Sequence, residues 1–68
     1  MTVSLTCNVF SATRLYPFDG EPYPLDRLIV TVDAPSLDEA FSETKARLAE
    51  KYGTTPEYVH ITGVSRQK

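Results

Sequence analysis

Residues 28–64 read LIVTVDAPSLDEAFSETKARLAEKYGTTPEYVHITGV, and most of the predicted fold follows from this stretch. It begins with a run rich in β-branched residues, 28–32, which is typical of a strand and which Asp33-Ala34-Pro35 interrupts. A helix then begins after Ser36 and ends before Gly53, and a second strand-like run covers residues 58–62. The order strand, helix, strand is therefore the clearest feature of the chain.

The helix carries signals at both ends. Ser36 and Glu39 have the spacing of a capping box, in which each side chain accepts a hydrogen bond from the other residue's backbone N–H. Gly53 suits the left-handed position that ends a helix. Between them runs an apolar stripe at helical spacing, with Phe41 and Leu48 as its expected centre in the core. The stripe consists of Leu37, Ala40, Phe41, Thr44, Leu48 and Tyr52.

An earlier strand is predicted over residues 2–9, where Val3, Leu5, Cys7 and Val9 alternate with polar residues. The element order is then β-β-α-β, an α+β fold in which one helix packs on one face of a small antiparallel three-stranded sheet. Residues 1–68 would form a single compact domain. A right-handed connection makes the third strand parallel to the second. The strand order 2-1-3 keeps every neighbouring pair antiparallel and is preferred over the order 1-2-3, which needs a parallel edge pair.

Residues 14–24 read RLYPFDGEPYP and predict the tip of a long hairpin. Three prolines argue against a regular helix or a central strand, and Asp19-Gly20 is a tight-turn signal. Three aromatic residues flank the turn: Tyr16, Phe18 and Tyr23. The small size of the domain favours an interpretation in which these rings fold back over the end of the core. The alternative is an exposed contact patch for a partner.

The third strand is expected to follow a short helical turn that begins at Thr55-Pro56. Its inward residues would be Val59 and Ile61, and its outward residues would be Tyr58, His60 and Thr62. Gly63 is expected to end or bulge the strand, and residues 65–68 are expected to fray. Ile29 and Phe10 fall on the outward face of the sheet, which suggests that another surface covers this face.

Composition limits the function classes. A net charge of -2 argues against nucleic acid as a partner, although Phe10, Tyr58 and His60 would make a weak platform for single-stranded bases. One cysteine excludes an internal disulfide. The first residues resemble no signal peptide and no apolar run is long enough to cross a bilayer, so the expected location is cytoplasmic.

Reaction chemistry is not recognisable in the sequence. Cys7 and His60 are the residues with catalytic potential near neutral pH, and the strand alternation puts them on opposite faces of the sheet. One Cys and one His do not complete a zinc site, and the scattered glycines form no phosphate loop. We therefore expect a non-catalytic protein without a cofactor or a metal.

Residues 30–53, VTVDAPSLDEAFSETKARLAEKYG, followed by VHITGV at 59–64, resemble the strand, capped helix and strand core of small phage and mobile-element proteins, some anti-CRISPR proteins among them. That resemblance implies a protein that binds and blocks, here a stoichiometric inhibitor of a bacterial CRISPR-type defence complex in the host cytoplasm. The alternative is an accessory subunit that forms a homodimer or larger homo-oligomer. The expected partner-binding residues are Tyr16, Phe18, Tyr23, Phe10, Tyr58 and His60.

Overall fold

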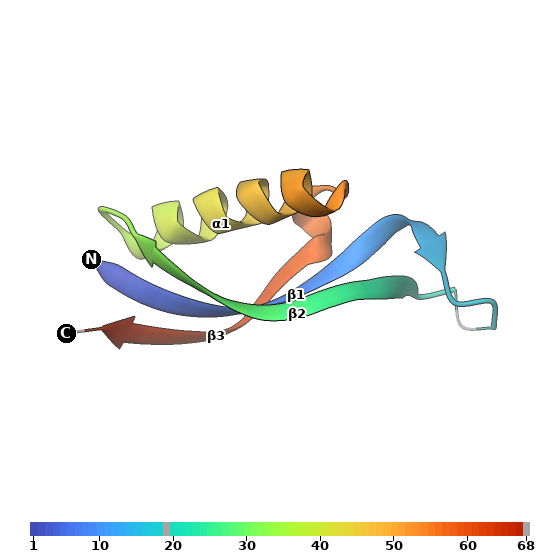
Figure 1. Ribbon diagram of the computed structural model, residues 1–68, viewed down its shortest axis with the longest axis horizontal. Helices are drawn as coiled ribbons and strands as arrows, with labels where there is room; N and C mark the ends of the chain where they lie inside the picture. Colours follow the sequence, from blue (N-terminus) through green and yellow to red (C-terminus); the bar gives the residue numbers. More distant parts are fainter. Residues whose placement is uncertain (19, 68) are drawn as a thin grey trace.

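The computed structural model describes residues 1–18 and 20–67, with the backbone alone for Gln67. The elements are β1 (Thr2–Leu15), β2 (Pro22–Asp33), α1 (Leu37–Tyr52), the short 3-10 helix η1 (Pro56–Tyr58) and β3 (Val59–Gln67). They confirm the predicted α+β fold: the sheet is antiparallel, its order is β2-β1-β3, and α1 lies over one face (Figure 1).

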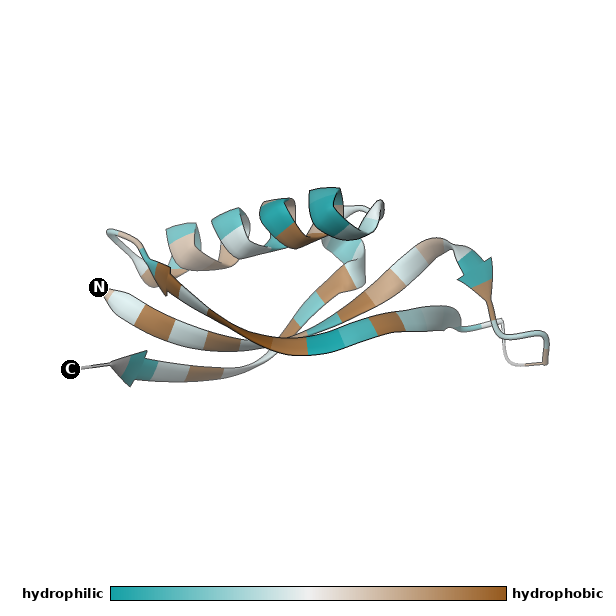
Figure 2. Cartoon of the chain, in the orientation of Figure 1, coloured by the Kyte–Doolittle hydropathy of each residue, from teal (hydrophilic) through white to brown (hydrophobic). Residues whose placement is uncertain are grey.

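The alternation in β1 produces the core. Its inward residues are opposite apolar partners on β2, with Val3 paired to Val32 and Leu5 paired to Val30. The four inward side chains of β1 have no exposed surface: Val3, Leu5, Cys7 and Val9. The same alternation is visible as brown and pale segments along the strand in Figure 2. A central strand buried on one face thus lies beneath a single helix, as a domain of this size requires.

Helix α1 begins and ends where the sequence indicates. The Ser36 hydroxyl accepts a hydrogen bond from the Glu39 N–H at 3.3 Å, and Gly53 has a φ of 66°. The capping box is only half formed, because within the described chain no bond joins the Glu39 carboxylate to the Ser36 N–H. The buried residues of the helix are Ala40, Thr44, Leu48 and Ala49. Phe41, expected at the centre of the core, is only half-buried at its margin.

A bulge shapes β3. Thr6 pairs with Gly63 while Cys7 pairs with Ile61, which leaves Thr62 as an extra residue and confirms the predicted irregularity near Gly63. Beyond the bulge Val64 is opposite Leu5, so it faces the helix side. The strand continues to Gln67, and the expected fraying from residue 65 is therefore wrong for 65–67, whereas Lys68 lies outside the described residues. Tyr58 belongs to η1 and not to the strand.

The other ends of β1 and β2 form a long hairpin, residues 11–25, which we call the arm. Figure 1 shows the arm projecting past the end of α1, and the molecule measures 44 × 18 × 15 Å. The prediction that prolines exclude a regular helix and a central strand here agrees with the structure, because the central strand β1 ends at Leu15, before Pro17, and Pro22 and Pro24 lie on the edge strand β2. The physical reason is that β2 is an edge strand, where a missing N–H can face away from the neighbouring strand. Gly20 has a φ of 68°, as a tight turn requires, and Asp19 lies outside the described residues.

Candidate partner-binding site on the hairpin arm

The arm concentrates the exposed apolar side chains of the described chain. Its exposed large hydrophobic residues are Leu15, Tyr16, Phe18, Tyr23 and Leu25, and elsewhere the described chain has only Met1, Ile29 and Val64. Phe18 is 99% exposed, and no arm residue belongs to the core cluster. The interpretation in which these rings fold back over the core is therefore wrong. An exposed apolar cluster of this kind is typical of an interaction surface.

Two arm aromatics stack on each other. The Tyr16 and Tyr23 ring centroids are 5.2 Å apart with the rings inclined at 45°, a geometry that aromatic pairs favour. The Arg14 guanidinium carbon lies 4.7 Å from the centre of the Tyr23 ring, within cation–π range. This stack joins the two strands of the arm across their end and gives the tip a support that does not depend on the core.

The turn itself is closed by the backbone. The Tyr16 N–H donates to the Glu21 carbonyl at 2.9 Å, and the Gly20 N–H donates to the Tyr16 carbonyl at 3.1 Å. Phe18 belongs to this closed loop, and its side chain is 99% exposed to solvent. The tip is therefore a backbone-braced turn that presents one aromatic ring to solvent.

At the base of the arm β1 departs from regular pairing with β2, and Ser11 stabilises this irregularity. Phe10 pairs with Pro24, and Leu15 pairs with Pro22. Between these two pairs β1 has residues 11–14, whereas β2 has only Tyr23. The buried Ser11 hydroxyl accepts from the N–H groups of Thr13 at 3.2 Å and Arg14 at 2.9 Å. A serine that bonds to backbone two and three residues later is a known local motif, and this signal would have indicated the irregularity from the sequence.

Asp26, the residue that follows the arm, is bonded to Tyr52 at the end of the helix. The Tyr52 hydroxyl donates to the Asp26 carboxylate, which also accepts from the Arg27 N–H at 2.7 Å. The bond from Tyr52 and then the Arg27 N–H hold the pKa of Asp26 below its ordinary value, and the same bond raises the pKa of Tyr52. Sequence reasoning missed this contact because it assigned Tyr52 only to the apolar stripe of the helix. The bond fixes the part of β2 next to the arm relative to the end of α1.

The outer sheet face carries a second, smaller aromatic group. The Phe10 and His60 rings are 5.0 Å apart and inclined at 54°, and Thr54 donates from its hydroxyl to the Phe10 carbonyl at 2.9 Å. Ile29 on the same face is 69% exposed. Tyr58, predicted to join this group, lies in η1, and within the described residues its ring contacts neither Phe10 nor His60. The six predicted residues thus divide into the arm group, the Phe10–His60 pair and the half-buried Tyr58, which makes no ring pair within the described chain.

Candidate catalytic groups lie apart. Cys7 is buried on the helix side of β1, where burial raises the pKa of its thiol, whereas His60 is exposed on the outer face. No group of three or more His, Cys, Asp or Glu side chains suited to a metal ion occurs within residues 1–18 and 20–67. In that same part of the chain, no helix has the length and apolar character needed to cross a membrane.

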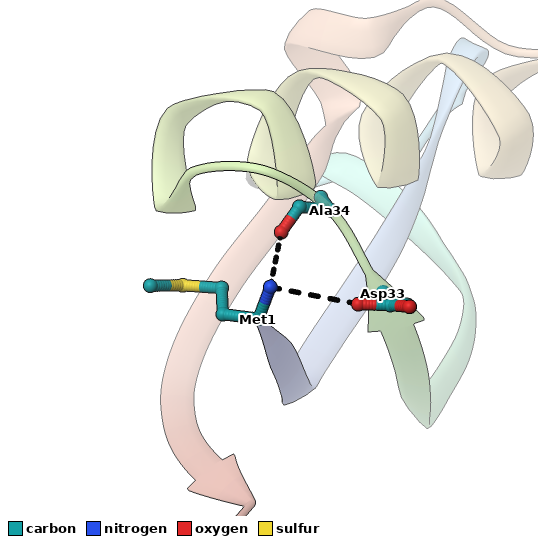
Figure 3. Close-up of polar contacts among 3 residues, drawn as sticks. All are labelled: Met1, Asp33 and Ala34. Atoms are coloured by element: carbon teal, nitrogen blue, oxygen red, sulfur yellow. Dashed lines mark hydrogen bonds and ion pairs between the residues drawn. The ribbon is translucent and has the colours of Figure 1, made fainter.

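The opposite end of the molecule holds a shallow depression lined by Met1, Asp33, Ala34 and Pro35. The Met1 amino group donates to the Ala34 carbonyl at 2.6 Å and lies 3.5 Å from the Asp33 carboxylate (Figure 3). The Ala34 N–H returns a bond to the Met1 carbonyl at 2.9 Å. These polar groups satisfy one another and hold the β2–α1 connection against the start of β1, so this corner has a structural role.

Comparisons of the chain with protein-family models, with curated proteins and with solved structures found no match. Its function is therefore inferred from the arm and the outer sheet face.

Proposed function

We propose that this chain is a small non-catalytic protein-binding domain and that the arm is its binding element. The observation that carries the proposal is Phe18, a large apolar side chain that is 99% exposed on a braced turn. Exposing such a ring to water is unfavourable by roughly 2 kcal/mol, and the ring contributes nothing to the core in return. Aromatic side chains on a preorganised loop are typical anchors in protein interfaces, since little conformational freedom remains to be lost on binding.

The charge around the anchor indicates the character of the partner. Residues 15–25 contain Asp19 and Glu21 and no lysine or arginine, and the Arg14 guanidinium is placed against Tyr23. The surface that fits such a tip is an apolar pocket bordered by basic groups, because opposite charges at the rim guide association and favour one partner over others. A strongly acidic partner would be repelled at the same place.

We further propose that the partner belongs to a bacterial defence complex of the CRISPR type, which the chain blocks stoichiometrically. This part rests on the resemblance of residues 30–53 and 59–64 to small anti-CRISPR proteins. The arm supplies what a blocking protein of this size needs, a projecting contact that enters a pocket on a larger assembly. Inhibition would then require binding alone, with no turnover of the partner.

The test uses the tagged chain with purified CRISPR interference complexes and measures target-DNA cleavage as the chain is titrated. We expect inhibition that is complete near an equimolar ratio for at least one complex type. Phe18→Ala and Tyr16→Ala should each weaken binding by about tenfold or more, since truncating an interface anchor costs about 2 kcal/mol. Unaltered thermal melting of Phe18→Ala would show that the loss is one of binding.

The matched control reverses charge on the solvated helix face. Glu43→Lys with Glu50→Lys changes the net charge far more than the aromatic truncations do, yet should reduce binding by less than about threefold. Loss of binding in this double variant, with binding intact in Phe18→Ala, would make the helix the binding face and reject the arm. Absence of inhibition across complex types would reject the defence-complex proposal, and binding to another captured protein through Phe18 would retain the arm.

A further inference from the structure

We infer that two copies of this chain associate through the outer edges of their β3 strands, which pair antiparallel to form a continuous six-stranded sheet. The inference does not depend on the proposed function of the arm. It begins from the two edges of the sheet, which are not equally protected. Natural proteins protect edge strands against pairing with prolines, charges and bulges.

The β2 edge has such protection along much of its length. Pro22 and Pro24 lack an N–H group, Leu25 is an extra residue between the Val9–Asp26 and Phe10–Pro24 pairs, and charged side chains follow at residues 26, 27 and 33. The β3 edge is protected less, because it has a bulge at Thr62 but residues 59–65 contain no proline and no Asp, Glu, Lys or Arg. Within the described chain β3 pairs with β1 alone, so its other side presents backbone groups that another strand can use.

The bulge selects a register for this pairing. Ile61 and Val64 are three positions apart, which in a regular strand would put them on opposite faces, yet both face the helix side because Thr62 is an extra residue. In an antiparallel self-pair with Ile61 of one copy opposite Val64 of the other, these side chains meet on the same face, as side chains of directly opposed residues do. Val64 is 44% exposed in the single chain, and two symmetric Ile61–Val64 contacts would cover it.

Charge at the two ends of β3 favours the antiparallel direction. Exposed Glu57 lies just before the strand and exposed Arg66 lies near its end. Antiparallel pairing brings the Arg66 end of each copy beside the Glu57 end of the other, so opposite charges approach twice. A parallel pair would instead bring like charges together at each end, which is unfavourable.

The geometry of the dimer follows from the fold. The start of β3 is paired with Val9, close to the base of the arm, so antiparallel β3 strands place the two arms at opposite ends of the assembly. Both helices would lie on the same face of the extended sheet. The dimer would therefore present two separated copies of the aromatic tip, and a partner with repeated binding sites would bind it more tightly than it binds one copy.

The test is sedimentation equilibrium of the full chain over a wide concentration range. One strand pair with two apolar contacts is smaller than the interface of a tight complex, so association in the micromolar range is expected. The average mass should be near 7.6 kDa at about 5 µM and should approach twice that value at about 500 µM. Val64→Lys should remain monomeric throughout, with circular dichroism melts confirming that it is folded.

Two controls place the interface. Ile29→Lys on the outer face and Phe18→Ala on the arm should associate as the wild type does. Arg66→Glu should weaken association by about twofold to fivefold, and adding Glu57→Lys should restore it. A wild-type chain that stays monomeric at about 500 µM, or a Val64→Lys variant that dimerises normally, would overturn the inference. Loss of dimer in Phe18→Ala would also overturn it, by assigning self-association to the arm.

Discussion

Thr44 shows how a single buried group limits stability. Its side chain is fully buried, and its hydroxyl oxygen is a buried side-chain atom without a hydrogen-bond partner within the described residues. A buried hydroxyl without a partner carries the full cost of leaving water, about 1–3 kcal/mol. Valine has nearly the same shape and nearly the same helix propensity. Thr44→Val should therefore raise the free energy of unfolding by about 1 kcal/mol in urea titrations.

The matched control is Thr54→Val, the same chemical change at a hydroxyl that does have a partner. Thr54 donates to the Phe10 carbonyl at 2.9 Å, so its loss should lower the free energy of unfolding by about 1 kcal/mol. The two substitutions are thus predicted to have opposite signs. Destabilisation by both would mean that the Thr44 hydroxyl has a partner in solution.

The Asp26–Tyr52 bond predicts a dependence of stability on pH. The pKa of Asp26 is lowered in the folded state. Asp26 therefore contributes stability that is present above its unfolded pKa of about 3.9 and is lost as pH falls through the lower folded value. The raised pKa of Tyr52 has the opposite sign, since its contribution is present below about pH 10 and is lost as pH rises through the folded value. Wild-type melting temperature should fall more steeply between about pH 5 and pH 2 than that of Tyr52→Phe. Tyr58→Phe removes a tyrosine hydroxyl elsewhere in the chain. Its melting temperature should depend on pH as that of the wild type does.

At the scale of elements, the cap of α1 predicts how much Ser36 contributes to the free energy of unfolding. The Ser36 hydroxyl holds the Glu39 N–H, one of the backbone donors at the helix start that have no partner within the helix. Ser36→Ala should cost about 1 kcal/mol of unfolding free energy. Ser42→Ala lies on the exposed surface of the same helix and should change it by less than about 0.5 kcal/mol. Equal effects of the two substitutions in urea melts would contradict a role for the Ser36 side chain as the cap.

The elements that the sequence predicted well are those in which one face is buried. The alternation in β1 and the 3.6-residue stripe in α1 both follow from burial of one face. The buried face of each element was therefore predicted correctly. Phe41 was misplaced because periodicity gives direction and not depth. Ala40 and Ala49 are both buried, so small side chains mark the close contact of α1 with the sheet, and the larger ring lies at the margin.

The elements that the sequence predicted poorly depend on neighbours far away in the chain. Pro22 and Pro24 exclude a central strand but not an edge strand, so the extension of β2 back to Pro22 depends on its edge position in the sheet. Gly63 predicted an irregularity in β3, but the extra residue, Thr62, is defined only by the pairing with β1, and without it Val64 would face the other side. In the candidate site, composition indicated the aromatic residues of the arm, whereas the Tyr16–Tyr23–Arg14 stack and the Asp26–Tyr52 bond join residues from different elements.

At the scale of the whole molecule, the core and the arm are predicted to be separable. Every buried residue of the core cluster lies within residues 3–9 or 32–59, and none comes from the described residues of the arm. Leu5→Ala removes a fully buried side chain of the central strand and should cost about 3 kcal/mol, a large share of the stability of so small a domain. Ile29→Ala on the exposed outer face should change unfolding free energy by less than about 0.5 kcal/mol. A core that tolerated Leu5→Ala would not be the single layer described above.

The same separation predicts that the tip can be removed without loss of the fold. Leu15 and Pro22 are paired, so replacing residues 16–21 by Asn-Gly would close the hairpin with a favoured two-residue turn. The replacement deletes the Tyr16–Tyr23 contact, but a shorter loop also lowers the entropy lost on closure, so the two effects oppose each other. We expect the melting temperature to change by less than about 5 °C, the shift that 1 kcal/mol produces in a domain of this size, while partner binding is lost. A fall of more than about 10 °C would show that the tip stabilises the fold, and the exposed Phe18 would then have to be explained by folding and not by binding.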